Sequence, residues 1–100
     1  MAEVIWTEPA LNDLDAIADY IALQDAAAAR NFVQAVFRHM DHLRQHPRLG
    51  SYPAELTNRR YRQIGEPPCR IFYRQDGPRV FIVHVMRSER LLRRASLTQR

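Results

Sequence analysis

The sequence predicts an α+β fold with the order β-α-α-β-β-β, in which a helix hairpin packs on one face of an antiparallel sheet. Three observations support this prediction. Residues 69–87 contain two β-prone runs around Asp76-Gly77, a dipeptide typical of tight hairpin turns. Residues 8–46 carry two successive helical patterns of apolar residues. Residues 3–6 and 59–64 are short β-prone runs that supply the remaining strands.

The first predicted elements are a strand over residues 3–6 and a helix over about 8–23. Thr7 is a suitable N-cap, and Pro9 lies in the first turn, where its missing N–H costs nothing. The apolar positions of the helix recur at intervals of three and four, at Leu11, Leu14, Ile17, Ala18 and Ile21. We expect these positions to face the core, together with Trp6 and Tyr20. The sequence does not determine whether strand 3–6 lies at an edge or in the centre.

A second helix is predicted from an Asp25 cap to residue 46, where Pro47 ends it. Because the connection is so short, the two helices should form an antiparallel αα-hairpin. The predicted core stripe of the second helix consists of Ala29, Phe32, Val33, Val36, Met40 and Leu43. His39, His42 and His46 share one flank and could ligate zinc, but no fourth ligand is near in sequence. We therefore expect no metal and no cofactor.

After a loop over residues 47–58 and strand 59–64, the hairpin of residues 69–87 presents two apolar faces. If Asp76 and Gly77 are the two turn residues, one face carries Cys69, Ile71, Tyr73, Val80, Ile82, His84 and Met86. The other face carries Phe72, Phe81, Val83 and Val85, framed by Arg70, Arg74, Arg79 and Arg87. An exposed apolar face is unstable in water, so both faces need cover. We expect the first to meet the helices and the second to bind a partner.

Length and composition indicate one domain over residues 1–100, with residues 88–100 as a terminal tail or short helix. The Leu91-Leu92 pair in this tail could close the second apolar face or be displaced from it by a partner. No apolar run approaches a membrane span, and the N-terminus does not resemble a secretory signal. The single cysteine, Cys69, is expected to pack within a strand. These features favour a cytoplasmic protein.

Charge is divided sharply along the chain. Residues 1–43 contain two arginines against seven acidic residues, whereas residues 44–100 contain thirteen arginines against four. All fifteen basic residues are arginine, whose planar guanidinium group suits carboxylate and phosphate partners. The C-terminal half should therefore attract an anionic partner.

Five stretches carry a resemblance to a known family: VIWTEPALNDLDAIADYI, HPRLG, RRYR, CRIFYR and VFIVHVMRSER. They are similar to segments of the RelE/ParE superfamily of bacterial toxins from type II toxin-antitoxin modules. The similarity covers roughly residues 4–90, and its most specific part is the first helix with Trp6-Thr7, Asp13-Leu14 and Tyr20-Ile21. The resemblance implies the same fold that the periodicity predicts.

The resemblance implies one of two activities. RelE-like members cleave mRNA in the ribosomal A site, and ParE-like members poison DNA gyrase. Both are neutralised by a cognate antitoxin whose C-terminal segment wraps around the toxin. Cleavage of RNA needs proton-transfer groups and cations at the phosphate, and the matching set here is Arg62, Arg70, His84 and Arg87.

The end of the chain favours the ParE-like branch. RelE-like nucleases usually carry a Tyr or His there, whereas no such residue follows Arg87. His84 also falls on the face assigned to the helices. We therefore expect a non-enzymatic gyrase inhibitor without catalytic residues, neutralised by a ParD-like antitoxin. The alternatives are a ribosome-dependent mRNA endoribonuclease and a degenerate module partner that only binds its antitoxin.

The expected partner-binding surface combines arginines with apolar residues of the hairpin and tail. Its members are Arg59, Arg60, Arg62, Arg70, Phe72, Arg74, Phe81, Val83, Arg87, Leu91 and Leu92. In this prediction, the arginines bond carboxylates at the rim while the apolar residues are buried by the partner.

Overall fold

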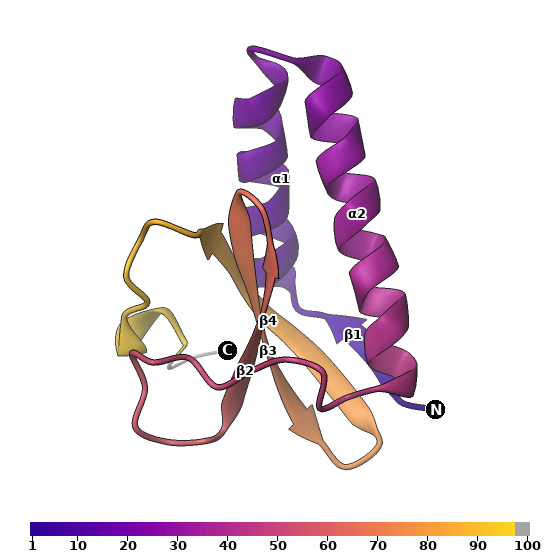
Figure 1. The fold of residues 1–100 in the computed structure, drawn as a ribbon, viewed down its shortest axis with the longest axis vertical. Helices are drawn as coiled ribbons and strands as arrows, with labels where there is room; N and C mark the ends of the chain where they lie inside the picture. Colours follow the sequence, from indigo (N-terminus) through magenta and orange to yellow (C-terminus); the bar gives the residue numbers. More distant parts are fainter. Residues whose placement is uncertain (98–100) are drawn as a thin grey trace.

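The computed structural model describes residues 1–97 and confirms the α+β class and the predicted order of elements (Figure 1). A helix pair lies beside a four-stranded sheet of order β1-β4-β3-β2. The elements are β1 (Glu3–Trp6), α1 (Glu8–Ala22), α2 (Ala26–Gln45), β2 (Tyr61–Glu66), β3 (Cys69–Asp76), β4 (Arg79–Arg87) and a single 3₁₀ turn, η1 (Arg94–Ser96). Within residues 1–97, no helix has the length and apolar character needed to cross a membrane.

The sheet is mixed, so the prediction of a fully antiparallel sheet is wrong for one strand. β1 occupies an edge and pairs in parallel with β4, from Glu3 opposite Arg79 to Trp6 opposite Ile82. Parallel neighbours need a long crossover connection, which the helix pair and the two intervening strands supply here. The Thr7 hydroxyl accepts from the Ala10 N–H as the predicted N-cap of α1 and donates to the Ile82 carbonyl at 2.7 Å.

β2 begins two residues later than predicted. The Asn58 side chain accepts the Arg60 N–H at 3.1 Å, which holds this part of the chain in a turn. The strand then continues past Ile64, because Gly65 and Glu66 pair with Arg70 and Cys69. β3 starts at Cys69, directly after Pro67-Pro68, as predicted.

The register of the β3–β4 hairpin differs from the prediction because Pro78, not Asp76, lies in the turn. The predicted ladder paired Gln75 with Pro78, but proline has no N–H to donate. In the structure Asp76 pairs with Arg79, so that Gly77, with φ +58°, and Pro78 form the turn. Because side chains alternate with a period of two, this two-residue shift by itself moves no side chain to the other face.

A β-bulge then exchanges the faces of the later β4 residues. Tyr73 pairs with Ile82 and Phe72 with His84, which leaves Val83 as an extra residue. Beyond it, Val85 joins the core beneath the helices, whereas Met86 joins the apolar cluster on the other face. The His84 ring stacks on Phe72 at 5.7 Å between centroids. The predicted faces of His84, Val85 and Met86 were therefore wrong.

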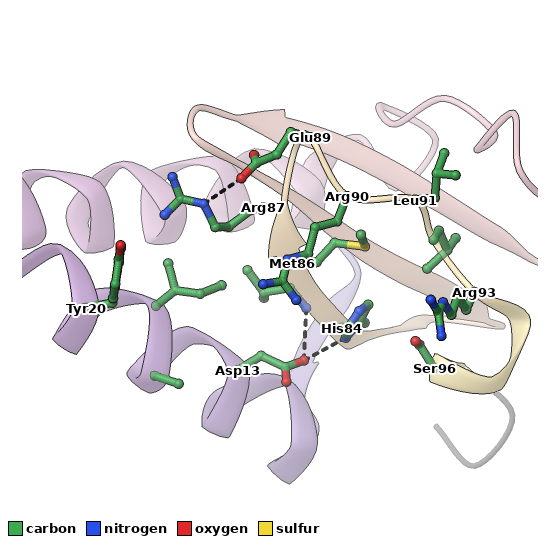
Figure 2. A pocket seen from close by; sticks show the side chains of 14 residues that line it. Asp13, Tyr20, His84, Met86, Arg87, Glu89, Arg90, Leu91, Arg93 and Ser96 are labelled. Carbon is green, nitrogen blue, oxygen red and sulfur yellow. Dashed lines mark hydrogen bonds and ion pairs between the residues drawn. The ribbon is translucent and has the colours of Figure 1, made fainter.

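The helix-facing core confirms most predicted positions. All of the α2 stripe is buried except Val33, which is half-buried. On α1, however, Ala10 is fully buried and Leu11 is 39% exposed, because the face toward β4 runs through Ala10, Leu14 and Ile17. Tyr20 is 59% exposed, so its predicted core position was wrong. Its ring lies at the surface, where the guanidinium group of Arg87 at the end of β4 is 5.7 Å from the ring centroid (Figure 2).

The opposite face of the sheet is covered by the end of the chain itself. Residues 88–97, which we call the strap, cross this face and place Leu92 and Leu97 in a second apolar cluster. The cluster also contains Tyr61, Phe72, Val83 and Met86, with Leu56 and Phe81 packed against it. Leu91 points outward and is 79% exposed. The predicted tail thus forms one short 3₁₀ turn, and its residues 98–100 lie outside the described residues.

Candidate partner-binding surface

An open groove of about 1310 Å³ runs between α1, the end of β4 and the strap (Figure 2). Its apolar lining includes Ile17, Val85 and Met86. Its charged lining consists of three arginines, Arg87, Arg90 and Arg93, together with Asp13, His84 and Glu89. The combination of apolar surface and cations is suited to a segment that carries both apolar and acidic side chains.

Asp13 closes one wall of this groove at the edge of β4. Because β1 ends opposite Ile82, the β4 backbone beyond that point has no strand neighbour on this side. The Asp13 carboxylate accepts the Val85 N–H at 3.1 Å, so this edge donor is satisfied. The same oxygen lies 2.8 Å from His84 Nδ1. Since a carboxylate only accepts, Nδ1 carries the proton, and the imidazole is fixed between Asp13 and Phe72.

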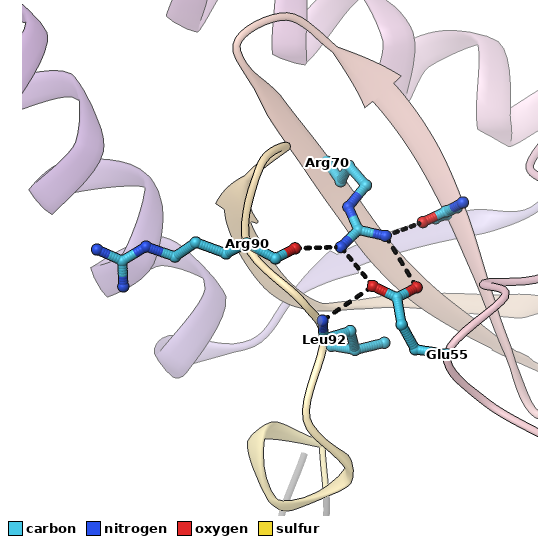
Figure 3. A network of polar contacts seen from close by, with 5 residues as sticks. Glu55, Arg70, Arg90 and Leu92 are labelled. Atoms are coloured by element: carbon cyan, nitrogen blue, oxygen red, sulfur yellow. Dashed lines mark hydrogen bonds and ion pairs between the residues drawn. The ribbon is translucent and has the colours of Figure 1, made fainter.

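The strap is held by a polar clasp that joins β3, loop 47–60 and the end of the chain (Figure 3). The Arg70 guanidinium donates two hydrogen bonds to Glu55, at 3.0 and 2.7 Å, and a third to the Arg90 carbonyl at 2.7 Å. Glu55 also accepts the Leu92 N–H at 2.9 Å. The hydrogen bonds from Arg70 lower the pKa of Glu55 to about 2. Arg70 therefore binds groups within the chain.

Four other arginines of the predicted surface lie over aromatic rings and do not line the groove. Arg74 packs over the Phe81 ring at 4.4 Å. Arg59 and Arg62 both lie over the Tyr52 ring, and Arg60 lies over Tyr61 at 5.7 Å. Of the four residues predicted for a nuclease site, His84 and Arg87 line the groove, whereas Arg62 and Arg70 are held in the loop and the clasp.

The apolar members of the predicted surface differ in accessibility. Phe72 and Val83 are fully buried beneath the strap, and Leu92 is 5% exposed. A partner could reach these three only if the strap moved. Leu91 lines the groove and is 79% exposed, so a partner can reach it without any movement, whereas Arg87 in the same lining is half-buried.

Several groove residues were missed by reasoning from the sequence. Arg90 and Arg93 belong to a basic run that the sequence displays plainly, yet nothing in the run indicates which face they take. Asp13 lies among the charged positions of α1, and no local signal distinguishes it from Asp15. Its place depends on where β1 ends against β4, which is a tertiary feature.

Two further candidates from the sequence, His39 and Cys69, make contacts within the fold. His39 lies with its Nδ1 3.1 Å from Glu66, and residues 1–97 contain no group of three or more His, Cys, Asp or Glu that could hold a metal. Cys69 is fully buried, as predicted, and burial raises the pKa of its thiol to about 11.

Comparison with known proteins defines the class. Residues 4–92 match the family model described as the ParE toxin of the type II toxin-antitoxin system parDE. A solved structure titled "Chromosomal ParDE TA system from P. aeruginosa" matches with a TM-score of 0.72 and 27% identity, covering 89% of this chain and 98% of that chain. No curated protein sequence matches. The fold and the family model define a toxin of a type II toxin-antitoxin system. Within that class, the chain belongs to the ParE toxin family, which confirms the resemblance.

Proposed function

We propose that this protein is a ParE-like inhibitor of DNA gyrase that acts in the cytoplasm and is neutralised by a cognate, ParD-like antitoxin. The observation that carries the proposal is the match of residues 4–92 to the ParE toxin family. In this proposal the toxin acts by binding, and no residue of the chain performs a chemical step on the target.

We place the antitoxin in the groove. Arg90 and Arg93 are exposed there, and no carboxylate among the described residues pairs with either guanidinium group. The two carboxylates of the lining are already engaged, Asp13 with His84 and Glu89 with Arg87 at 2.8 Å. The groove thus has an excess of positive charge beside apolar surface. An acidic segment with one or two apolar anchors satisfies both features.

The proposed target is tested with purified gyrase and purified toxin. Saturating toxin should suppress negative supercoiling of relaxed plasmid or trap a cleavage complex that detergent converts into linear DNA. Addition of the antitoxin should restore supercoiling. Ordinary supercoiling without any trapped complex at saturating toxin would contradict the proposal.

One observation favours the alternative, a ribosome-dependent mRNA endoribonuclease. Asp13 orients His84 in the same groove that Arg87 lines, and a carboxylate-oriented imidazole beside cations is an arrangement used in general base catalysis. Primer extension on ribosome-engaged mRNA distinguishes the two activities. Codon-positioned cuts that disappear in His84→Ala and Arg87→Ala, but persist in Arg48→Ala, would establish the nuclease instead of the gyrase inhibitor.

A further inference from the structure

Two arginines converge on one exposed tyrosine beside the edge strand β2, outside the lining of the groove. Arg62 lies 4.3 Å from the centroid of the Tyr52 ring, and Arg59 lies 5.2 Å from the same centroid. Tyr52 is 39% exposed and Arg59 is exposed. One ring at the surface therefore has two guanidinium groups within 5.2 Å of its centroid.

Arg62 is fixed in this position by the loop that precedes β2. Its Nη1 donates to the Gly50 carbonyl at 2.8 Å, and its Nη2 donates to the Tyr52 hydroxyl at 2.9 Å. Strand β3 holds this loop in place through Tyr73. The buried Tyr73 hydroxyl accepts the Gly50 N–H and donates to the Pro47 carbonyl, both at 2.8 Å. A guanidinium group has five N–H donors, so Arg62 keeps donors for a ligand while its orientation is already determined.

Among residues 1–97, no carboxylate forms an ion pair with Arg59 or Arg62. Between residues 42 and 65 the sequence has one acidic residue, Glu55, and its carboxylate is bound to Arg70 and the Leu92 N–H. The same stretch contains four further arginines besides Arg59, of which Arg60 and Arg48 are also exposed. Like charges held together at a surface repel each other, and an anion that bonds to both relieves the repulsion.

We propose that Arg59 and Arg62, brought together over Tyr52, bind a phosphate group of a nucleic acid backbone. Two features favour a phosphodiester over an acidic peptide. Arginine donates in the paired geometry that phosphate oxygens accept. An acidic peptide with an apolar anchor also has a better place in the groove, whose lining includes neither Arg59 nor Arg62. Neighbouring exposed arginines would contact further phosphates of the same backbone.

The test uses the full-length toxin alone, without gyrase or antitoxin, so its outcome is independent of the proposed function. Binding is measured by fluorescence anisotropy with a labelled DNA duplex of about 20 base pairs and with a single-stranded RNA of similar length, from about 50 to 200 mM salt. These two probes share the phosphodiester chemistry and identify which nucleic acid is preferred.

The main variant is Arg59→Glu, because Arg59 contributes a ring contact and no hydrogen bond that the loop needs. Its matched control is Arg30→Glu, an exposed arginine of α2 with the same change in net charge. Arg59→Glu should weaken binding of the preferred nucleic acid by about tenfold at low salt and reduce the slope of log affinity against log salt by about 1. The control should retain the wild-type slope.

Three results would overturn the inference. One is an absence of binding to either nucleic acid at low salt. Another is an equal loss of affinity and slope in Arg59→Glu and Arg30→Glu, which would indicate net charge without a site. The third is stronger competition by poly-glutamate than by unlabelled DNA or RNA of equal charge, which would assign the site to an acidic protein.

Discussion

At the scale of single residues, Gly50 has a role that its backbone angles do not reveal. A Cβ at this position would lie 2.6 Å from the Gln63 carbonyl oxygen and 2.8 Å from the Tyr73 ring. The close approach lets Gly50 give its N–H to the buried Tyr73 hydroxyl and its carbonyl to Arg62. Burial also raises the pKa of Tyr73, which keeps this hydroxyl as a donor. Position 50 therefore needs glycine because there is no room for a Cβ atom.

Gly50→Ala should destabilise the fold by about 2 kcal/mol or more, because the Gln63 carbonyl belongs to the backbone of β2 and cannot yield easily. Gly65→Ala is the matched control, since a Cβ there meets nothing within 4 Å. Its free energy of unfolding should stay within about 0.5 kcal/mol of the wild type. Denaturant unfolding of both variants measures the difference, and equal stabilities would refute the packing argument.

Glu55 should make stability depend on acid pH. Its pKa falls from 4.5 to about 2 in the folded chain, so the folded state favours the charged form. The stabilisation is complete above the ordinary pKa and is lost as the pH falls from about 4.5 toward 2. Glu55→Gln should lower stability by about 2 kcal/mol at neutral pH and weaken its dependence on pH in this window.

The control for this prediction is Asp15→Asn, which removes an exposed carboxylate of α1. Unfolding by urea at neutral pH and at about pH 3 gives the required free energies. If Glu55→Gln lost as much stability on acidification as the wild type, the clasp would not be the source of the pH dependence.

At the scale of elements, apolar periodicity was enough to predict both helices, and turn chemistry was enough to place the hairpin. The predicted register was wrong for two physical reasons. Pro78 cannot donate in a ladder, which is a signal that the sequence contains, whereas the bulge at Val83 depends on how β4 meets β3 and has no local signal. The groove was missed because it forms where α1, β4 and the strap meet. No local pattern in residues 88–97 indicates that the strap packs beside α1 and β4.

The strap provides a matched pair of neighbouring leucines. Leu92 is 5% exposed over Phe72 and Val83, whereas Leu91 is 79% exposed. Leu92→Ala should cost about 2–4 kcal/mol and increase binding of a hydrophobic dye, because the second apolar cluster loses its cover. Leu91→Ala should leave both quantities near the wild type. Equal effects of the two changes would mean that the strap does not cover the sheet in solution.

At the scale of the whole molecule, acidic and basic residues are separated. The acidic residues of the first half lie mostly along the helices, and the arginines of the second half lie on the sheet, the loop and the strap. Within residues 1–97, no carboxylate forms an ion pair with Arg90 or Arg93 in the groove. The two proposals above use this charge in different places, with an acidic antitoxin segment in the groove and a nucleic acid phosphate at Arg59 and Arg62.

If the antitoxin binds in the groove, Arg90→Glu combined with Arg93→Glu should weaken its affinity by about a hundredfold, while growth arrest by the toxin alone persists. Both side chains are exposed, so the fold should be unaffected. The control is Arg30→Glu combined with Arg38→Glu on α2, which carries the same charge change. Calorimetry with the purified antitoxin, and rescue of growth by its co-expression, give the readouts. Unchanged affinity would move the antitoxin to another surface.

The parallel pairing of β1 with β4 has a consequence for the time at which the toxin acquires its shape. The hydrogen bond between Thr7 and Ile82 joins residues 75 positions apart, and β1 has no other strand neighbour. During synthesis β1 must therefore wait for β4, the last of the four strands. Such distant pairing slows folding in general. The sheet therefore stays incomplete on the ribosome until β4 has been made, and the groove can form only after residues 88–97 have followed.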